Sequence, residues 1–210
     1  MSIHIPENSN FNAFAMIVDI NGYNQLVNHP DAISIAQFTR DILSDCIDAI
    51  ENQNVEVVGF MGDALLAFLE NSDDVFMACV KIAKDLDQLC EYILLESDVF
   101  QFAPKGVSLK IGIEYGTIEV SSIHSHFSGT QKLFASPAIN YAQRILSAKK
   151  RGNRCLIGPN AYQNDLNSYT FQSRKAFKVK GKPGEGNYSY YQLDLSDIWR
   201  EGESTESYWG

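Results

Sequence analysis

A nearly continuous apolar stretch at residues 55–69 carries one short break, Met-Gly-Asp at 61–63. Two β-branched, aromatic or aliphatic runs around a glycine predict a β-hairpin. Because both arms are apolar, we expect the hairpin to be central and buried. Asp63 then lies at the mouth of a hydrophobic sheet, where a carboxylate is costly without a partner. Ordinary turn chemistry explains Asp63 equally well on this stretch alone, because Asp and Gly favour turns.

A second carboxylate ends the first apolar run of the chain. Residues 14–19 predict a buried strand closing in Asp19, and Ile-Asn-Gly-Tyr-Asn at 20–24 predicts a turn. In that turn, Gly22 lets backbone amides approach a ligand closely. Helical spacing of apolar residues predicts helices over 31–50 and about 71–90, and residues 107–123 predict a second hairpin that turns at Gly116.

These elements give the order strand, helix, strand, strand, helix, strand, which is the ferredoxin-like βαββαβ unit of an α+β fold. Its first and third strands are antiparallel neighbours, so the end of the first lies beside the start of the third. We therefore expect Asp19 and Asp63 to converge. Two carboxylates at that distance repel each other unless a cation lies between them, and oxygen ligands suit Mg²⁺ or Mn²⁺.

The C-terminal extension contains one further helix with polar residues of interest. Ser136 followed by Pro predicts a helix start, and the helix is expected to run to about residue 148. Asn140 and Arg144 lie one turn apart, opposite its apolar face, so both can reach one ligand outside the domain. Ordinary surface polarity is the alternative. A short strand (154–157), a short helix (159–166) and two strands (169–180 and 188–193) complete the extension.

Composition limits the classes of partner. The net charge is −9, which argues against nucleic-acid binding. Ten of the 17 basic residues nevertheless lie within 144–182, with Asp165 as the single acid, so this segment suits an anionic ligand or is a solvated basic face. No apolar run is long enough for a membrane span, and no signal peptide is recognisable. Four cysteines without a CxxC pair predict reduced, buried thiols in a cytoplasmic protein.

Five motifs occur in order along the chain. They are Asp-Ile-Asn-Gly-Tyr (19–23), Phe-Met-Gly-Asp (60–63), Ile-Gly-Ile-Glu-Tyr-Gly (111–116), Ile-Asn-Tyr-Ala-Gln-Arg (139–144) and Val-Lys-Gly-Lys (179–182). Together they make residues 13–193 resemble the catalytic domain of class III nucleotidyl cyclases. The third motif departs from the family pattern, because Glu114 stands in place of His. Residues 1–12 are expected to form a loose arm, and residues 194–210 an acidic tail.

The resemblance implies a homodimer whose active sites are shared between two subunits. Asp19, Asp63 and the carbonyl of Ile20 would hold two divalent cations, Mn²⁺ or Mg²⁺, that activate the ribose 3′-hydroxyl and neutralise the triphosphate. Backbone amides of the same loop would cradle phosphate oxygens. The loop residues concerned are Asn21, Gly22 and Tyr23.

The other subunit would supply the remaining contacts. By the same resemblance, Asn140 orients the ribose and Arg144 stabilises charge at the α-phosphate, while Lys180 holds the terminal phosphates. The products would be a 3′,5′-cyclic nucleotide and pyrophosphate. The positive charge of the basic segment would then complement the negative charge of the triphosphate.

Two departures concern the base of the nucleotide. Adenylate cyclases of this class usually carry a Lys and an Asp at the positions of Gly59 and Leu133, and this pair selects the purine. Gly59, Phe60 and Leu133 would line the base pocket here without it. A short cyclase with intact catalytic residues and no purine selector resembles the pyrimidine cyclases of Pycsar antiphage systems, whose cyclic UMP or cyclic CMP activates a separate effector protein.

The leading hypothesis from this resemblance is a pyrimidine nucleotide cyclase, with uridylate preferred over cytidylate because of its frequency in that family and not because of any residue here. A cytidylate cyclase is the first alternative, and an atypical adenylate or guanylate cyclase is the second. The third is a catalytically silent, cyclase-like binding module. Loss of a metal-binding Asp or of Arg144 would mark such a module, and neither is lost.

Overall fold

The computed structural model describes residues 8–26, 32–52, 57–96, 108–125, 129–148, 154–169 and 176–194. Its centre is a mixed sheet in the order β2-β3-β1-β4-β6-β8-β7, with β5 paired to β4 outside this order. The strands are β1 (Ser9–Asn21), β2 (Val57–Met61), β3 (Ala64–Leu69), β4 (Ser108–Ser125), β5 (Gly129–Ala135), β6 (Arg154–Ile157), β7 (Phe177–Lys180) and β8 (Asn187–Asp194). The helices are α1 (Tyr23–Leu26), α2 (Ala32–Glu51), α3 (Ser72–Glu96), α4 (Pro137–Leu146), α5 (Pro159–Gln163) and the 3₁₀ turn η2 (Leu166–Ser168).

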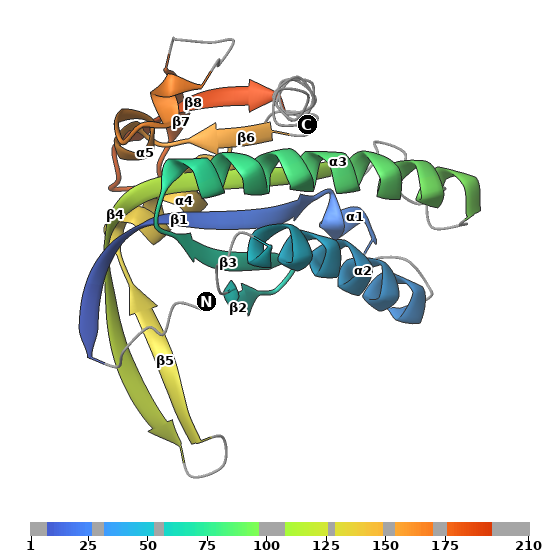
Figure 1. The fold of residues 1–210 in the computed structure, drawn as a ribbon, viewed down its shortest axis with the longest axis horizontal. Helices are drawn as coiled ribbons and strands as arrows, with labels where there is room; N and C mark the ends of the chain where they lie inside the picture. The colour runs from blue at the N-terminus through green and yellow to red at the C-terminus, as the bar shows by residue number, and fades with distance from the viewer. Residues whose placement is uncertain are drawn as a thin grey trace, which may run out of the picture.

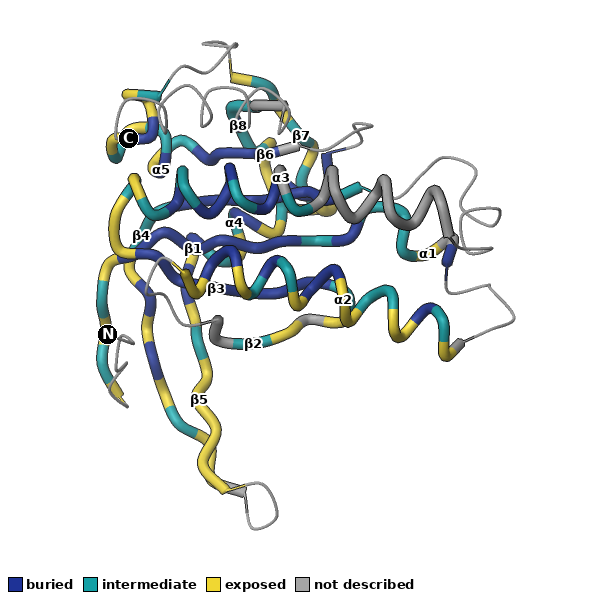
Figure 2. The backbone as a smooth tube through the Cα atoms, turned by 45° about the vertical axis from the view of Figure 1, so that its right-hand side comes forward, coloured by how far each residue is buried: buried dark blue, intermediate teal, exposed yellow. Residues whose placement is uncertain are grey.

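The order β1-α2-β2-β3-α3-β4 confirms the ferredoxin-like unit predicted from the sequence. Helices α2 and α3 lie together on one face of the sheet (Figure 1). Alternate side chains of β1 divide between two cores. Met16 and Val18 pack with α2 and α3, whereas Ala15 and Ile17 face the other way, towards α4. The central strands are therefore buried on both faces (Figure 2).

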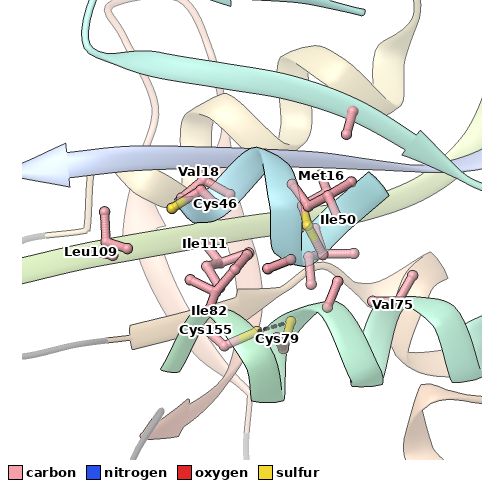
Figure 3. Close-up of a cluster of buried hydrophobic side chains, with 14 of the residues drawn as sticks. Met16, Val18, Cys46, Ile50, Val75, Cys79, Ile82, Leu109, Ile111 and Cys155 are labelled. Carbon is pink, nitrogen blue, oxygen red and sulfur yellow. Dashed lines mark hydrogen bonds between the residues drawn. The ribbon is translucent and has the colours of Figure 1, made fainter. Parts of the chain in front are cut away.

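The larger core is built from residues of β1, α2, α3, β4 and β6 that interdigitate between the sheet and the two long helices (Figure 3). Cys46, Cys79 and Cys155 are buried free thiols in this core, as predicted. The sulfur atoms of Cys79 and Cys155 are 3.8 Å apart. The side chain of Cys90 lies outside the described set.

Helix starts follow their capping signals. The Asn71 side chain accepts a hydrogen bond from the amide of Asp74 at 2.8 Å, at the start of α3. The Ser136 hydroxyl accepts one from the amide of Ala138, and Pro137 occupies the first turn of α4. Helix α4 ends at Leu146, close to the predicted end. None of the helices in the described ranges is long and apolar enough to cross a bilayer.

The β2–β3 hairpin forms as predicted, but its expected central position is wrong for one arm. Strand β3 is wholly buried, whereas β2 is the edge of the sheet and the side chain of Phe60 is 60% exposed. The apolar composition of both arms does not show which arm lies at the edge of the sheet.

The prediction of a second hairpin over residues 107–123 is also wrong. Strand β4 runs without a turn from Ser108 to Ser125, and the hairpin lies instead between β4 and β5, which project from the body of the molecule (Figure 1). Gly116 is paired with Ala13 inside the sheet, and a Cβ on it would lie 3.2 Å from the Cβ of Ala138. This glycine serves close packing of α4 on β4 and does not form a turn.

The ends of the chain differ in part from expectation. Residues 9–12, expected in a loose arm, belong to β1 and pair with residues 117–120 of β4. Residues 1–7 and the tail after 194 lie outside the described residues. Of the strand expected over 169–180, only Phe177–Lys180 is a described strand, and residues 170–175 also lie outside the description.

Candidate active site

Two carboxylates meet at adjoining ends of β1 and β3, as the topology predicted. Asp19 is paired with Ala64 across these strands, and Asp63 directly precedes Ala64 in the hairpin turn. Gly62 makes that turn possible with a φ of 70°, a conformation that other residues rarely adopt. The pKa of Asp19 is raised, first by burial and then by the charge of Asp63, while Lys110 lowers it. The two carboxylates therefore repel each other, as an unneutralised pair must.

Lys110 is a buried cation beside this pair that the sequence analysis missed. It is paired with Asp19 across β1 and β4 and is only 8% exposed. Its Nζ donates to the carbonyls of Leu146 and Ala148 at 3.4 and 3.2 Å, beyond the end of α4. Burial lowers the pKa of Lys110, and Asp19 opposes that shift. A single lysine inside the mostly apolar run at 107–113 was the signal available in the sequence.

Lys110 thus lies between the Asp19 carboxylate and the C-terminal end of α4. Asp19 and Ile17 lie on the same face of β1, the face that α4 covers. The ammonium group interacts with Asp19 and satisfies carbonyls at the C-terminal end of α4, where positive charge is favourable. The side chain therefore connects the acidic end of β1 to the end of α4.

The donor set fits a divalent cation bound together with its substrate. Asp19 and Asp63 provide carboxylate oxygens, and Ile20 follows Asp19 with a backbone carbonyl. Within the described ranges, no group of three or more His, Cys, Asp or Glu side chains could hold a metal alone. Mg²⁺ is commonly held by one or two carboxylates, with waters and substrate phosphates completing its shell. The mutual repulsion of the carboxylates would be relieved by such an ion.

The loop after β1 is anchored by Asn21 and turns at Gly22. The Asn21 side chain donates to the Ser108 hydroxyl at 2.9 Å, which fixes the end of β1. Gly22 has a φ of 98°, and Tyr23 begins the short helix α1. The amides of Gly22 and Tyr23 thus follow directly after the carboxylate end of the strand.

Helix α4 presents the two predicted polar residues differently. Asn140 is exposed, as the helical wheel predicted. Arg144 does not project freely, because its Nε and Nη2 donate to the Glu185 carboxylate at 3.0 and 2.9 Å. Glu185 lies in the turn between β7 and β8, beyond Lys180 at the end of β7. No local pattern indicates this ion pair, because its two members are 41 residues apart in the chain.

The residues expected around the base lie on exposed parts of the sheet. A Cβ built on Gly59 would meet no atom within 4 Å. Phe60 on β2 and Leu133 on β5 are 60% and 46% exposed. These two are among the four large apolar residues that the described part of the chain leaves exposed, together with Ile33 and Ile123.

Arg144 and the carboxylate pair remain separate in a single chain. Among the described residues, no hydrogen bond or ion pair joins Arg144 to Asp19 or Asp63. Lys180 is likewise exposed at the end of its strand. One chain therefore displays two half-sites, one acidic and one basic.

The comparisons with known proteins show which family the chain belongs to. The family model described as the adenylate and guanylate cyclase catalytic domain matches residues 7–194. The chain belongs to this family.

Three similar proteins illustrate the relationship. An adenylate cyclase of Anabaena cylindrica is 26% identical over 173 residues, which are 80% of this chain but 34% of that protein, so the chain spans about a third of its length. The crystal structure of the guanylyl cyclase Cya2 gives a TM-score of 0.71 at 15% identity, covering 90% of this chain and 94% of that one. A class III adenylyl cyclase-like ATP-binding protein from Pseudomonas aeruginosa gives a TM-score of 0.65 at 14% identity, and the match covers 90% of this chain and 40% of that one. These structures share the class III cyclase fold.

Glu114, which stands where the family motif has His, is buried between β4 and α5. Its side chain is 1% exposed and accepts hydrogen bonds from the amides of Tyr115 and Ala161 at 2.9 and 2.8 Å. Burial raises its pKa, and these amides oppose the shift. Glu114 therefore connects β4 to the start of α5 and is a packing residue outside the candidate active site.

Proposed function

We propose that this cyclase converts UTP to 3′,5′-cyclic UMP and pyrophosphate, as a homodimer with shared active sites. The observation that carries the proposal is the convergence of Asp19 and Asp63 at adjoining strand ends of a class III cyclase fold. Such a pair is costly to keep together unless it binds a cation.

The acidic half-site would hold the metals and the phosphates. Two divalent cations, Mg²⁺ or Mn²⁺, bound by Asp19, Asp63 and the Ile20 carbonyl would supply charge neutralisation and lower the pKa of the ribose 3′-hydroxyl. The amides of Gly22 and Tyr23 would donate hydrogen bonds to phosphate oxygens. The new bond joins the 3′-oxygen to the α-phosphorus, the hydroxyl proton departs, and the bond between the α-phosphorus and pyrophosphate breaks.

The basic half-site would come from the second copy of the chain. Asn140 of the partner subunit would hold the ribose and orient its hydroxyl. The partner's Arg144 would stabilise the charge that develops around the α-phosphorus, and the partner's Lys180 would bind the terminal phosphates. The separation of the two half-sites in one chain supports this division.

The base preference rests on Gly59 and Leu133. Neither residue offers a side-chain donor or acceptor, so a purine would gain no polar recognition at these positions. A pyrimidine is therefore favoured, with CTP as the alternative to UTP. By the same resemblance to the Pycsar cyclases, the cyclic nucleotide would act in the cytoplasm on a separate effector protein in antiphage defence.

A second candidate is a nucleotide-binding module without turnover. It is favoured by the structural likeness to the cyclase-like ATP-binding protein of Pseudomonas aeruginosa and by the engagement of Arg144 with Glu185. Such a module would bind nucleotides but release no pyrophosphate.

The test is incubation of the purified protein with each of ATP, GTP, CTP and UTP in the presence of Mn²⁺, followed by chromatography. Cyclic UMP as the main product supports the proposal. Cyclic CMP as the main product would keep the pyrimidine assignment and would make CTP, and not UTP, the substrate. Binding without any cyclic product would establish the silent module, and equal or higher kcat/KM for ATP in direct competition would remove the pyrimidine assignment.

A further inference from the structure

The carboxylate of Glu185 accepts four hydrogen bonds beside the basic half-site. Oε2 accepts from Arg144 Nε at 3.0 Å, from the backbone amide of Lys182 at 3.0 Å and from the Tyr188 hydroxyl at 3.2 Å. Oε1 accepts from Arg144 Nη2 at 2.9 Å. Nothing in the five cyclase motifs assigned a role to this residue.

The turn that carries Glu185 is itself well fixed. The amide of Glu185 donates to the Lys182 carbonyl at 2.9 Å, and the Gly181 amide donates to the Gly186 carbonyl at 3.1 Å. Gly184 closes the turn with a φ of 90°. The β7–β8 turn therefore sets the position of the carboxylate independently of Arg144.

The same turn is joined to α4 by a second contact. The Tyr188 ring packs edge-on against Tyr141, with ring centroids 5.0 Å apart. The Tyr141 hydroxyl donates to the Ser189 carbonyl and accepts from the Ser189 amide, both at 3.0 Å. Glu185 and Arg144 thus lie on two elements whose relative position is fixed independently of their ion pair.

We propose that Glu185 is a positioning residue that orients Arg144 towards the α-phosphate. It holds the Nε–Nη2 edge of the guanidinium in a two-bond contact, which fixes both the rotamer and the plane of the group. A guanidinium has five N–H donors in a rigid fork, so one edge can be held while other donors serve a phosphate. This inference rests on the proposed cyclase function. Glu185 would orient Arg144 before the substrate binds.

The opposite role would be competition, with Glu185 occupying Arg144 until the triphosphate displaces it. The two roles predict opposite kinetics. A positioning residue supports the transition state, so its loss lowers kcat and leaves KM nearly unchanged. A competing residue weakens substrate binding, so its loss lowers KM and leaves kcat unchanged or higher.

The experiment measures kcat and KM of Glu185→Gln, which keeps the size of the side chain but removes its charge and one acceptor for Arg144. We expect a roughly 10- to 100-fold lower kcat with KM within about twofold of wild type, because a misplaced catalytic group has effects of this size. Glu119→Gln is the matched control, since Glu119 is exposed on β4 and paired with Ala135. The melting temperature and dimer content of each variant are measured alongside.

A double-mutant cycle separates positioning from a general structural role. In an Arg144→Lys background the two-bond contact is already lost, so adding Glu185→Gln should cause little further loss of kcat. An equal loss in both backgrounds, or a wild-type kcat in Glu185→Gln, would overturn the inference while leaving an active cyclase. A wild-type protein that makes no cyclic nucleotide from any of the four substrates would instead remove the proposed function, and this inference with it.

Discussion

At the residue scale, Asp19 and Asp63 are the centre of the proposed chemistry. Replacing either by Asn removes a metal-binding oxygen while keeping the size of the side chain. Charge neutralisation and activation of the hydroxyl together account for several kcal/mol, so we expect kcat to fall at least about 1000-fold. A direct assay of pyrophosphate release measures this, with circular dichroism to establish folding. A folded variant with near-normal turnover would contradict the two-carboxylate site.

The stability of the metal-free protein should reflect the same carboxylates. The pKa of Asp19 is raised by burial and by Asp63, so its protonated form favours the folded state. The contribution of Asp19 to the free energy of unfolding is therefore present at low pH and is lost as the pH rises through the raised pKa. At neutral pH, Mn²⁺ should therefore raise the melting temperature of wild type, and it should raise that of Asp19→Asn much less. Equal shifts in both proteins would place the metal elsewhere.

The base preference can also be tested at single residues. A side chain at Gly59 would meet open space, and Leu133 is 46% exposed, so both positions accept polar replacements without strain. Gly59→Lys combined with Leu133→Asp would restore a donor and an acceptor for a purine. We expect kcat/KM for ATP relative to UTP to rise about tenfold or more in competition assays. The Gly59→Ala variant should leave the ratio unchanged.

At the scale of elements, the packing of α4 on β4 determines where Asn140 and Arg144 lie. A Cβ on Gly112 would be 2.6 Å from the Ala142 carbonyl and 2.8 Å from a Leu146 side-chain carbon. Gly112→Ala must therefore displace α4, at a cost of about 1–3 kcal/mol. Chemical denaturation should show this loss, and kcat should fall with it. Gly116→Ala is the milder comparison, because its Cβ would meet only the Cβ of Ala138, at 3.2 Å, so a smaller loss of stability is expected.

The elements differ in how far the sequence could predict them. Strand β1, the β2–β3 hairpin and helices α2, α3 and α4 were predicted because their apolar periodicity and caps are local signals. The β4–β5 hairpin was missed because β5 is mostly exposed and because Gly116 has the composition of a turn but the environment of a packed strand. The hydrophobic pattern records burial, so a projecting exposed strand leaves little trace in it.

The candidate site shows the same limit. Asp19 and Asp63 could be placed together because the βαββαβ topology fixes which strand ends adjoin. Lys110 and Glu185 could not be assigned, because their partners are set by packing between segments far apart in the chain. Sequence spacing locates residues within one element. It does not show which charged group on another element will meet them.

At the scale of the whole molecule, the proposed active site needs two chains. Asp63 belongs to the acidic half-site and Arg144 to the basic one, so Asp63→Ala and Arg144→Ala should each be inactive as homodimers. In a mixed dimer, one site carries both defects and the other is intact. With equal and random exchange, half of the dimers are mixed, and each has one working site, so activity should return to roughly a quarter of wild type.

The recovery should grow with the extent of subunit exchange and should disappear when the subunits are cross-linked before mixing. Native mass spectrometry measures the mixed dimers directly, which ties recovered activity to their number. If mixed dimers form and no activity returns, each chain carries a complete site of its own. Arg144 would then have to reach Asp19 and Asp63 within one subunit, although in the described structure it is held by Glu185 on another part of the fold. That result would leave the cyclase fold intact and remove the shared-site mechanism.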